Sequence, residues 1–240
     1  MRIITCGDTH GRVKWKEIVA KEASADKIIF IGDYFDTHSK GVSGNKQIVN
    51  FKEILEFKKA NPPQVVLLIG NHDFHYIRGI GETYSGYQAG YALEIGELVE
   101  GAIKDGHMQM CYLQDGYLFS HAGLTKTWYG LVTGNYTPVV DDMLVQTIND
   151  ILAYQPNRFI FRMGDNFSDT GNDVTQGPIW VRPYSLSKDK VDGVICVVGH
   201  TPTRNGITIV EESGIILTDC LGETDEYLVI EDGKARSSNN

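Results

Sequence analysis

The sequence predicts an α/β fold in which two packed, mixed β-sheets are flanked by helices. In the first third of the chain, short apolar strands alternate with helical patterns, which is typical of parallel strands buried on both faces. The later part of the chain is instead rich in short strands that suit hairpins. Strand–helix units followed by hairpins therefore predict two sheets with helices outside them.

The first half of the chain alternates strand and helix. The runs Arg2–Cys6, Lys27–Ile31 and Val65–Ile69 predict buried strands, because they are almost continuously apolar. Between them, Val13–Ala23 and Ile48–Lys59 predict helices, and the apolar residues of the first helix share one face. These strand–helix–strand units place the three strands in parallel.

A further helix is expected at Gln88–Lys104. Just before and within it, Tyr84, Tyr87 and Tyr91 are separated by three and four residues. This is the spacing of neighbours on one helix face, so we expect the three rings to pack as such a face.

The second half changes to hairpins and short strands. Asp115-Gly116 lies between the apolar runs Met108–Leu113 and Tyr117–Ser120, and Asp-Gly between two such runs predicts a tight hairpin. One helix and four short strands complete the expected elements: Val139–Tyr154, Val194–Val198, Ile207–Val210, Ile215–Thr218 and Tyr227–Ile230.

The length of 240 residues, of which 42% are hydrophobic, is enough for one large core without disulfides. We expect a single domain over residues 1–234, with a cap or insertion allowed within residues 125–192. Ala235–Asn240 is expected to be a frayed, flexible tail.

The composition limits the classes of partner and the location that we expect for this protein. The chain has 22 basic and 31 acidic residues, a net charge of −9, which argues against a nucleic-acid partner. It has no apolar run long enough for a membrane span, and its polar start leaves no room for a signal peptide. We therefore expect a cytoplasmic protein. The scattered cysteines predict small, buried, reduced thiols and neither a disulfide framework nor a zinc site; they are Cys6, Cys111, Cys196 and Cys220. The oligomeric state stays open.

Polar clusters follow five of the expected strands at the point where each strand ends. In parallel sheets the carboxyl ends of strands face a common crevice, so we expect these clusters to converge. Carboxylates, imidazoles and an amide oxygen suit Mn²⁺, iron, Zn²⁺ or Mg²⁺. The clusters supply eight candidate residues: Asp8, His10, Asp33, Asp36, Asn71, His72, His121 and His200.

In this order, the clusters resemble the motifs of the calcineurin-like metallophosphoesterase family. That family carries Asp-x-His, Gly-Asp-x-x-Asp, Gly-Asn-His-Asp/Glu, a lone His and Gly-His. Three blocks are similar to the branch of Ser/Thr phosphoprotein phosphatases, phage phosphatases and diadenosine tetraphosphatases: Gly7-Asp8-Thr9-His10-Gly11, His121-Ala122-Gly123 and Gly199-His200-Thr201-Pro202. The resemblance implies a four-layer sandwich of helices, two sheets and helices.

The resemblance also implies a role for each matching residue. A hydroxide between two divalent metal ions would attack phosphorus, with Mn²⁺ favoured and iron, Zn²⁺, Ni²⁺ or Mg²⁺ as alternatives. His72 would be the general acid, oriented by Asp36, whereas His75 is expected at the surface or against site residues and not on a metal. The implied ligands are Asp8 and His10 for one metal, Asp33 for both, and Asn71, His121 and His200 for the other.

The sequence departs from the family pattern at two places. Thr37 stands where the phosphoprotein phosphatases have a phosphate-gripping arginine, and Lys40 or Lys46 of the following loop would have to supply that charge instead. Arg182 is similar to a second phosphate-binding arginine of that branch, which the resemblance implies as the remaining clamp. Gly-His-Thr-Pro also lacks the second histidine of the broader family's Gly-His-x-His. The first metal would therefore have one protein ligand fewer.

Hydrolysis of a phosphate monoester, on a phosphoprotein or a small molecule, is the activity expected first. A nucleotide pyrophosphohydrolase of the diadenosine tetraphosphatase type is the alternative, followed by a phosphodiesterase. A non-catalytic interaction module on the same fold is the alternative of a different class. Degenerate members of that kind should lose the general acid or the bridging carboxylate, and this chain keeps His72 and Asp33.

Overall fold

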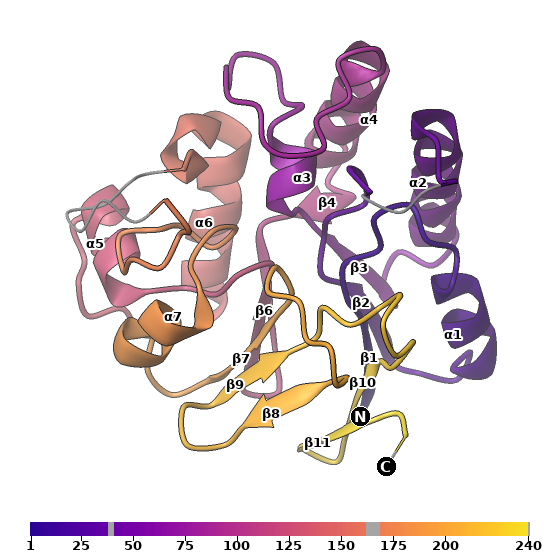
Figure 1. Cartoon of the computed structure of the whole chain (residues 1–240). Helices are drawn as coiled ribbons and strands as arrows, with labels where there is room; N and C mark the ends of the chain where they lie inside the picture. Colours follow the sequence, from indigo (N-terminus) through magenta and orange to yellow (C-terminus); the bar gives the residue numbers. More distant parts are fainter. Residues whose placement is uncertain (38–40, 162–168, 240) are drawn as a thin grey trace.

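The computed structural model describes residues 1–37, 41–161 and 169–239. Two mixed sheets face each other in the middle of the molecule, and helices lie outside them (Figure 1). This arrangement confirms the predicted α/β fold with two flanked sheets. Within the described ranges, no helix has both the length and the apolar character needed to cross a membrane.

The first sheet has six strands in the order β11-β10-β1-β2-β3-β4. Strands β1 to β4 run parallel, and β10 and β11 add antiparallel strands at the edge. Helices α1, α2 and α4 cover its outer face, and the short α3 directly follows β3 (Figure 1). The bounds are β1 Arg2–Cys6, α1 Trp15–Lys21, β2 Lys27–Phe30, α2 Gly44–Ala60, β3 Val65–Leu68, α3 Asn71–Phe74, α4 Ala92–Lys104, β4 Met108–Gln109, β10 Leu228–Glu231 and β11 Lys234–Ser237.

The second sheet has five strands in the order β5-β6-β7-β9-β8. Helices α5, α6 and α7 lie together on the other side of the molecule from α1 and α2 (Figure 1). The bounds are β5 Cys111–Gln114, β6 Tyr117–Ser120, α5 Lys126–Thr133, α6 Asp142–Tyr154, the 3-10 helix η1 Pro156–Phe159, α7 Pro183–Asp189, β7 Ile195–Val198, β8 Thr208–Val210 and β9 Ile215–Leu217.

A continuous apolar layer joins the two sheets. Ile3, Ile29 and Leu68 of the first sheet pack in one cluster with Phe119 and Val197 of the second, and all five are fully buried. Their neighbours along the strands face the helices on the other side of each sheet. Burial on both faces explains why these strands are apolar throughout, and each such side chain contributes about 1.5–3 kcal/mol when it leaves water.

The run Met108–Leu113, expected as one strand, is divided between the two sheets. Met108–Gln109 forms β4 beside β3, whereas Cys111–Gln114 forms β5 beside β6. Asn149 of α6 causes the break, because its Oδ1 accepts the backbone N–H groups of Met110 and Cys111 at 2.9 and 3.1 Å. The hairpin that follows β5 is as expected, and Asp115 and Gly116 both have positive φ.

The expected frayed tail is wrong for residues 235–237, which belong to strand β11. Asp232 and Gly233 have φ of 50° and 73° and form the turn that returns β11 along β10. Ser237 Oγ also donates to Glu226 Oε2 at 2.6 Å. The Asp-Gly signal that predicted the first hairpin is thus repeated here, and sequence reasoning missed it.

The prediction that Tyr84, Tyr87 and Tyr91 pack together on one helix face is wrong. Residues 84–91 form turns, and α4 begins only at Ala92. Gln88 leaves the helical path because its N–H donates to Tyr76 Oη at 2.9 Å. The rings pack separately: Tyr84 stacks on His75 with centroids 5.2 Å apart, and Tyr87 stacks on Tyr76.

Candidate functional site

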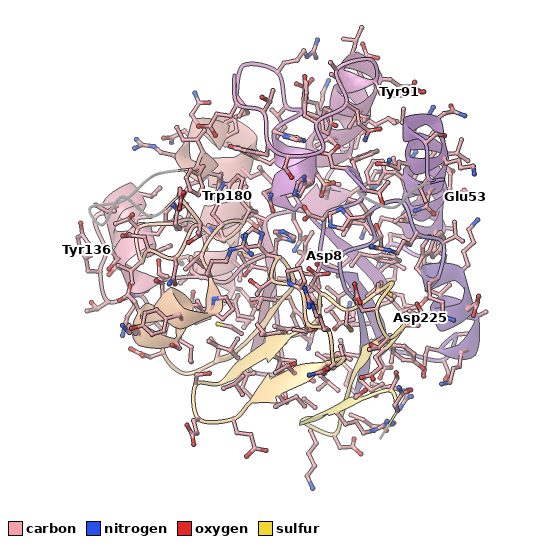
Figure 2. All side chains as sticks on the ribbon, in the orientation of Figure 1. Asp8, Glu53, Tyr91, Tyr136, Trp180 and Asp225 are labelled. Atoms are coloured by element: carbon pink, nitrogen blue, oxygen red, sulfur yellow. The ribbon has the colours of Figure 1, made fainter. Side chains whose placement is uncertain are left out.

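The polar clusters that follow β1, β2, β3 and β7 meet in one pocket of about 370 Å³. Figure 2 shows Asp8 near the centre of the molecule, with Trp180 on the side of helices α5 to α7. His121, after β6, is buried directly behind the wall. The pocket brings together seven residues that the sequence singled out: Asp8, His10, Asp33, Asn71, His72, Arg182 and His200.

Asp33 lies between the two halves of the site. Its Oδ2 is 3.3 Å from His121 Nε2 and 3.7 Å from His10 Nε2, and its Oδ1 accepts the N–H of His72 at 2.9 Å. One carboxylate thus faces a histidine that follows a strand of the second sheet and one that follows a strand of the first. Asp8, His10 and Asp33 also offer three ligand atoms within 4.8 Å of one another.

A backbone carbonyl fixes the ring orientation of each of the three histidines His10, His121 and His200. His10 Nδ1 is 2.7 Å from Phe35 O, and His121 Nδ1 is 3.0 Å from Ile31 O. A carbonyl can only accept, so Nδ1 of His10 and Nδ1 of His121 each carry a proton, and Nε2 is the ring nitrogen that each of these two residues turns toward the site. Imidazoles that bind metals are commonly held in this way.

Asn71 links the second group of candidate ligands. His200 Nε2 is 3.1 Å from Trp180 O, which turns His200 Nδ1 toward Asn71 Oδ1 at 2.9 Å. His121 Nε2 approaches the same Asn71 oxygen at 2.9 Å. One amide oxygen and two ring nitrogens therefore converge on one side of Asp33.

The pocket fits divalent cations. Asp8 Oδ1 is buried and has no hydrogen-bond partner among the described residues, although Oδ2 accepts the N–H of His200 at 2.9 Å. Burying a carboxylate oxygen without a partner lowers the stability of the fold, unless a cation binds to that oxygen. Gly199 and Gly70 leave room for these carboxylates, since a Cβ on them would lie 1.9 Å from Asp8 Oδ1 and 2.1 Å from Asp33 Oδ1.

The electrostatics of the pocket also favour a cation. Burial lowers the pKa of His121, but the carboxylates of Asp33 and Asp8 outweigh burial and raise it to about 10. Burial raises the pKa of Asp8 well above its ordinary value, and the charges of Asp219 and Asp33 raise it further. Both directions report a strongly negative potential, which a divalent ion would neutralise.

Four site residues hold a left-handed backbone that sequence patterns do not show. The φ angles are 44° for His10, 52° for Asp33, 62° for Asp36 and 61° for His200. Non-glycine residues adopt this conformation at a cost of about 1 kcal/mol or more, and such residues gather at functional sites. The tight turns after the strands aim these side chains into one pocket.

His72 and Asp36 form a pair at the edge of the pocket. His72 Nδ1 is 3.2 Å from Asp36 Oδ2. Burial lowers the pKa of His72, but Asp33 and Asp36 outweigh burial and raise it. Burial raises the pKa of Asp36, yet the hydrogen bonds from His72 and other neighbours bring it down to about 2. The ring is therefore suited to hold a proton and Asp36 to stay charged.

Arg182 lies in the pocket wall with its guanidinium anchored on the protein. Its Nη1 donates to His200 O at 2.8 Å and to Thr201 Oγ1 at 3.2 Å, and its Nε donates to Thr170 O at 2.9 Å. Lys46 instead lines a neighbouring pocket with Arg12. Lys40, the other expected alternative, lies outside the described residues.

Sequence reasoning missed two acidic residues of the site. The carboxylate of Asp73 accepts the N–H groups of Asp33 and Tyr34, both at 2.8 Å, and of Gly70 at 2.9 Å, so it clamps the turns after β2 and β3 together. Asp219 lines the pocket, where burial and then Asp33 raise its pKa to about 6. It follows β9 closely, so the strand-end rule that found the other clusters could have found it.

Comparisons with known proteins were made for the family, for curated relatives and for the fold. The model of the calcineurin-like phosphoesterase family matches residues 1–204. The fold is similar to a protein serine/threonine phosphatase from Saccharomyces cerevisiae with similarity to human phosphatase PP5, with a TM-score of 0.55 and 14% identity over 97% of this chain and 73% of that one. A predicted phosphoesterase from Streptococcus pneumoniae TIGR4 is matched over 98% of this chain and 95% of that one, with a TM-score of 0.31 and 11% identity. Among curated proteins no match is found.

The family match covers the motifs from the Asp8 cluster to the His200 cluster, which are the residues that build the pocket. It therefore confirms the resemblance drawn from those motifs. The chain belongs to the calcineurin-like phosphoesterase family and is a metal-dependent phosphoesterase.

Proposed function

We propose that the chain hydrolyses phosphate monoesters at a site that holds two divalent metal ions. This proposal rests on the position of the Asp33 carboxylate, which lies between His10 on one side and His121 on the other. Asp8 and His10 would hold one ion, and Asp33 would bridge to the other. Asn71, His121 and His200 would hold that second ion.

The protein's own groups would position the substrate and supply the proton. Two bound divalent ions would activate a water for in-line attack and neutralise the phosphoryl oxygens. His72, held by Asp36 through Nδ1, would donate the proton of Nε2 to the leaving oxygen. Arg182 would grip the phosphate from the wall next to His200.

We propose Mn²⁺ as the metal, as the family resemblance implies, and the ligand set is compatible with it. The side chains offer carboxylate, amide and imidazole groups, which are hard to borderline ligands. Iron, Zn²⁺, Ni²⁺ and Mg²⁺ are the alternatives to be compared. The four cysteines are buried as free thiols, which also supports a reducing, cytoplasmic setting.

A nucleotide anhydride of the diadenosine tetraphosphate type is the second candidate substrate. Tyr84 and Trp180 line the pocket and pack edge to face with ring centroids 4.4 Å apart. An aromatic wall beside a phosphate site could stack a nucleobase. The monoester is preferred because the His72–Asp36 pair suits a leaving group that needs a proton, which also argues against a non-catalytic module.

Metal removal tests the proposed site directly. We expect chelated, desalted protein to be inactive toward p-nitrophenyl phosphate, and Mn²⁺ to restore turnover with two ions bound per chain. The physical reason is that the buried Asp8 Oδ1 has no hydrogen-bond partner among the described residues, while His121 and His200 converge on the Asn71 oxygen as a ligand set would. Turnover is measured by absorbance and metal content by mass spectrometry. Full activity in excess chelator, with verified metal loss, would contradict the proposal.

Arg182 tests how phosphate is held. We expect Arg182→Ala to lower kcat/KM for p-nitrophenyl phosphate roughly tenfold or more, because a charge-assisted hydrogen bond contributes about 1.5–3 kcal/mol. Thr37→Arg should raise kcat/KM if its backbone places the new guanidinium at the phosphate. Metal content is measured on both variants, because Arg182 also holds the His200 carbonyl. Unchanged kinetics in both variants would leave phosphate binding to the metals.

A further inference from the structure

Asp36, the partner of His72, sits in a cage of four side chains. Its side chain is fully buried. Oδ1 accepts from Tyr76 Oη at 2.5 Å and from Gln88 Nε2 at 3.1 Å. Oδ2 faces two histidine rings, His72 Nδ1 at 3.2 Å and His75 Nε2 at 2.6 Å. The nearer neighbour of this oxygen is therefore His75 and not the proposed acid.

Two contacts fix which nitrogen of His75 carries the proton. His75 Nδ1 accepts the backbone N–H of Tyr84 at 3.0 Å, so this nitrogen presents its lone pair. The ring proton is left on Nε2, the atom that faces Asp36 Oδ2. Nε2 is buried and forms no hydrogen bond of regular geometry among the described residues, so its 2.6 Å approach to Asp36 Oδ2 is a close contact between the ring and the carboxylate that a small rotation of the ring would align. Asp36 is thus the group toward which His75 is directed.

We propose that His75 is a positioning residue for the general acid: its Nε2–H holds Asp36 Oδ2 in place, so that Asp36 keeps the His72 ring aimed at the leaving oxygen. This role rests on the proposed function, in which His72 donates that proton. Tyr76 and Gln88 cannot replace His75, because both bind the opposite oxygen, Oδ1. Without His75 the carboxylate keeps one anchored oxygen and can rotate away from His72.

His75 and Gln88 connect Asp36, the partner of the proposed acid His72, with residues of the pocket wall and of α2. The His75 ring stacks on Tyr84 with an angle of 5° between the planes, and Tyr84 lines the pocket. Gln88 also reaches Gln47 of α2 at 3.0 Å while it holds Asp36. The segment 84–91 therefore supports Asp36 from outside the strands that carry the metal ligands, and His75 can be replaced without touching a ligand.

The test compares two esters and two substitutions in the Mn²⁺-loaded protein. Phenyl phosphate has a poor leaving group that needs a proton, whereas p-nitrophenyl phosphate needs it much less. We expect His75→Leu to lower kcat on phenyl phosphate about tenfold or more, as loss of a charge-assisted hydrogen bond predicts. KM, metal content and turnover of p-nitrophenyl phosphate should change little. His75→Gln keeps an N–H donor near Nε2 and should restore most of the rate.

His107→Leu is the matched control, since it makes the same exchange between α4 and β4, away from the pocket, and should leave both rates unchanged. Equal losses on both esters, or no rescue by His75→Gln, would overturn the positioning role. If wild-type protein hydrolyses neither ester, the proposed function fails and this role fails with it. If the wild type is active and His75→Leu matches it on phenyl phosphate, only the role of His75 fails.

A spectroscopic measurement covers the case in which His75→Leu does not fold. The ring nitrogens of His75 are assigned by ¹⁵N NMR in the Mg²⁺-loaded protein, with His75→Gln identifying the signals. We expect a proton on Nε2 and a bare Nδ1. A ring protonated on Nδ1 alone would overturn the proposal, because Nε2 could then not hold Asp36.

Discussion

Replacement of Asp33 by asparagine is expected to empty the metal site and to remove most of the activity. Asp33 Oδ2 is the atom shared between the His10 side and the His121 side of the pocket. The amide removes the negative charge that would draw two cations together. Metal ions contribute several kcal/mol of transition-state stabilisation in such sites, so kcat should fall at least ~10²-fold. Metal content after desalting and kcat on p-nitrophenyl phosphate measure both effects.

Asp115→Asn is the control for this substitution. Asp115 has a φ of 50°, close to the 52° of Asp33, but lies in the exposed turn of the first hairpin. Asparagine tolerates the left-handed region, so neither exchange should disturb the backbone. Asp115→Asn should keep full metal content and activity. If Asp33→Asn also keeps both metals and turnover, Asp33 does not bridge them.

It was possible to predict that the site residues meet in one place, because each cluster follows a strand whose apolar residues predict that it is buried. Val65–Leu68 is apolar throughout, so its position inside a sheet follows from composition, and Asn71 and His72 come immediately after it. The same holds for Asp8 after β1 and His200 after β7. Parallel strands then carry these residues to one edge without any further information.

The contacts that set the fine geometry could not be predicted in this way, because they join residues far apart in the chain. Asn149 ends β4 from a helix 38 residues away and so divides one apolar run between two sheets. Asp73 binds the backbone of Asp33 across 40 residues, although its carboxylate looks like part of a motif. Only the packed fold shows which partner each group finds.

Some local signals were present in the sequence but were not used. Helix α5 has Thr125 as its N-cap, whose hydroxyl accepts the N–H of Trp128 at 3.1 Å, and α7 begins at Pro183. Both are common helix starts, yet neither helix was expected, since a helix of seven or eight residues has a weak periodic pattern. The approach of His75 to Asp36 is different, because it depends on the turn path of residues 84–91.

His72→Asn should separate proton donation from metal binding. His72 is not among the proposed ligands, and its backbone N–H to Asp33 Oδ1 is retained by asparagine. Both metal ions should therefore stay bound. A positioned imidazole contributes about 10²–10⁴-fold in rate when the leaving oxygen needs a proton, so kcat on phenyl phosphate should fall by about that factor. The loss on p-nitrophenyl phosphate should be much smaller, since that leaving group departs as a stable anion.

The pair of variants decides which residue has which role. If His72 is the acid, a plot of log kcat against leaving-group acidity should be steeper for His72→Asn than for wild type, at unchanged metal content. Asp33→Asn should instead lose metal and lose turnover of good and poor leaving groups alike. His107→Asn is the control for the same exchange outside the pocket. Should His72→Asn release metal while Asp33→Asn retains it, the two assignments are reversed: His72 would be a metal ligand, and Asp33 would not bridge the ions.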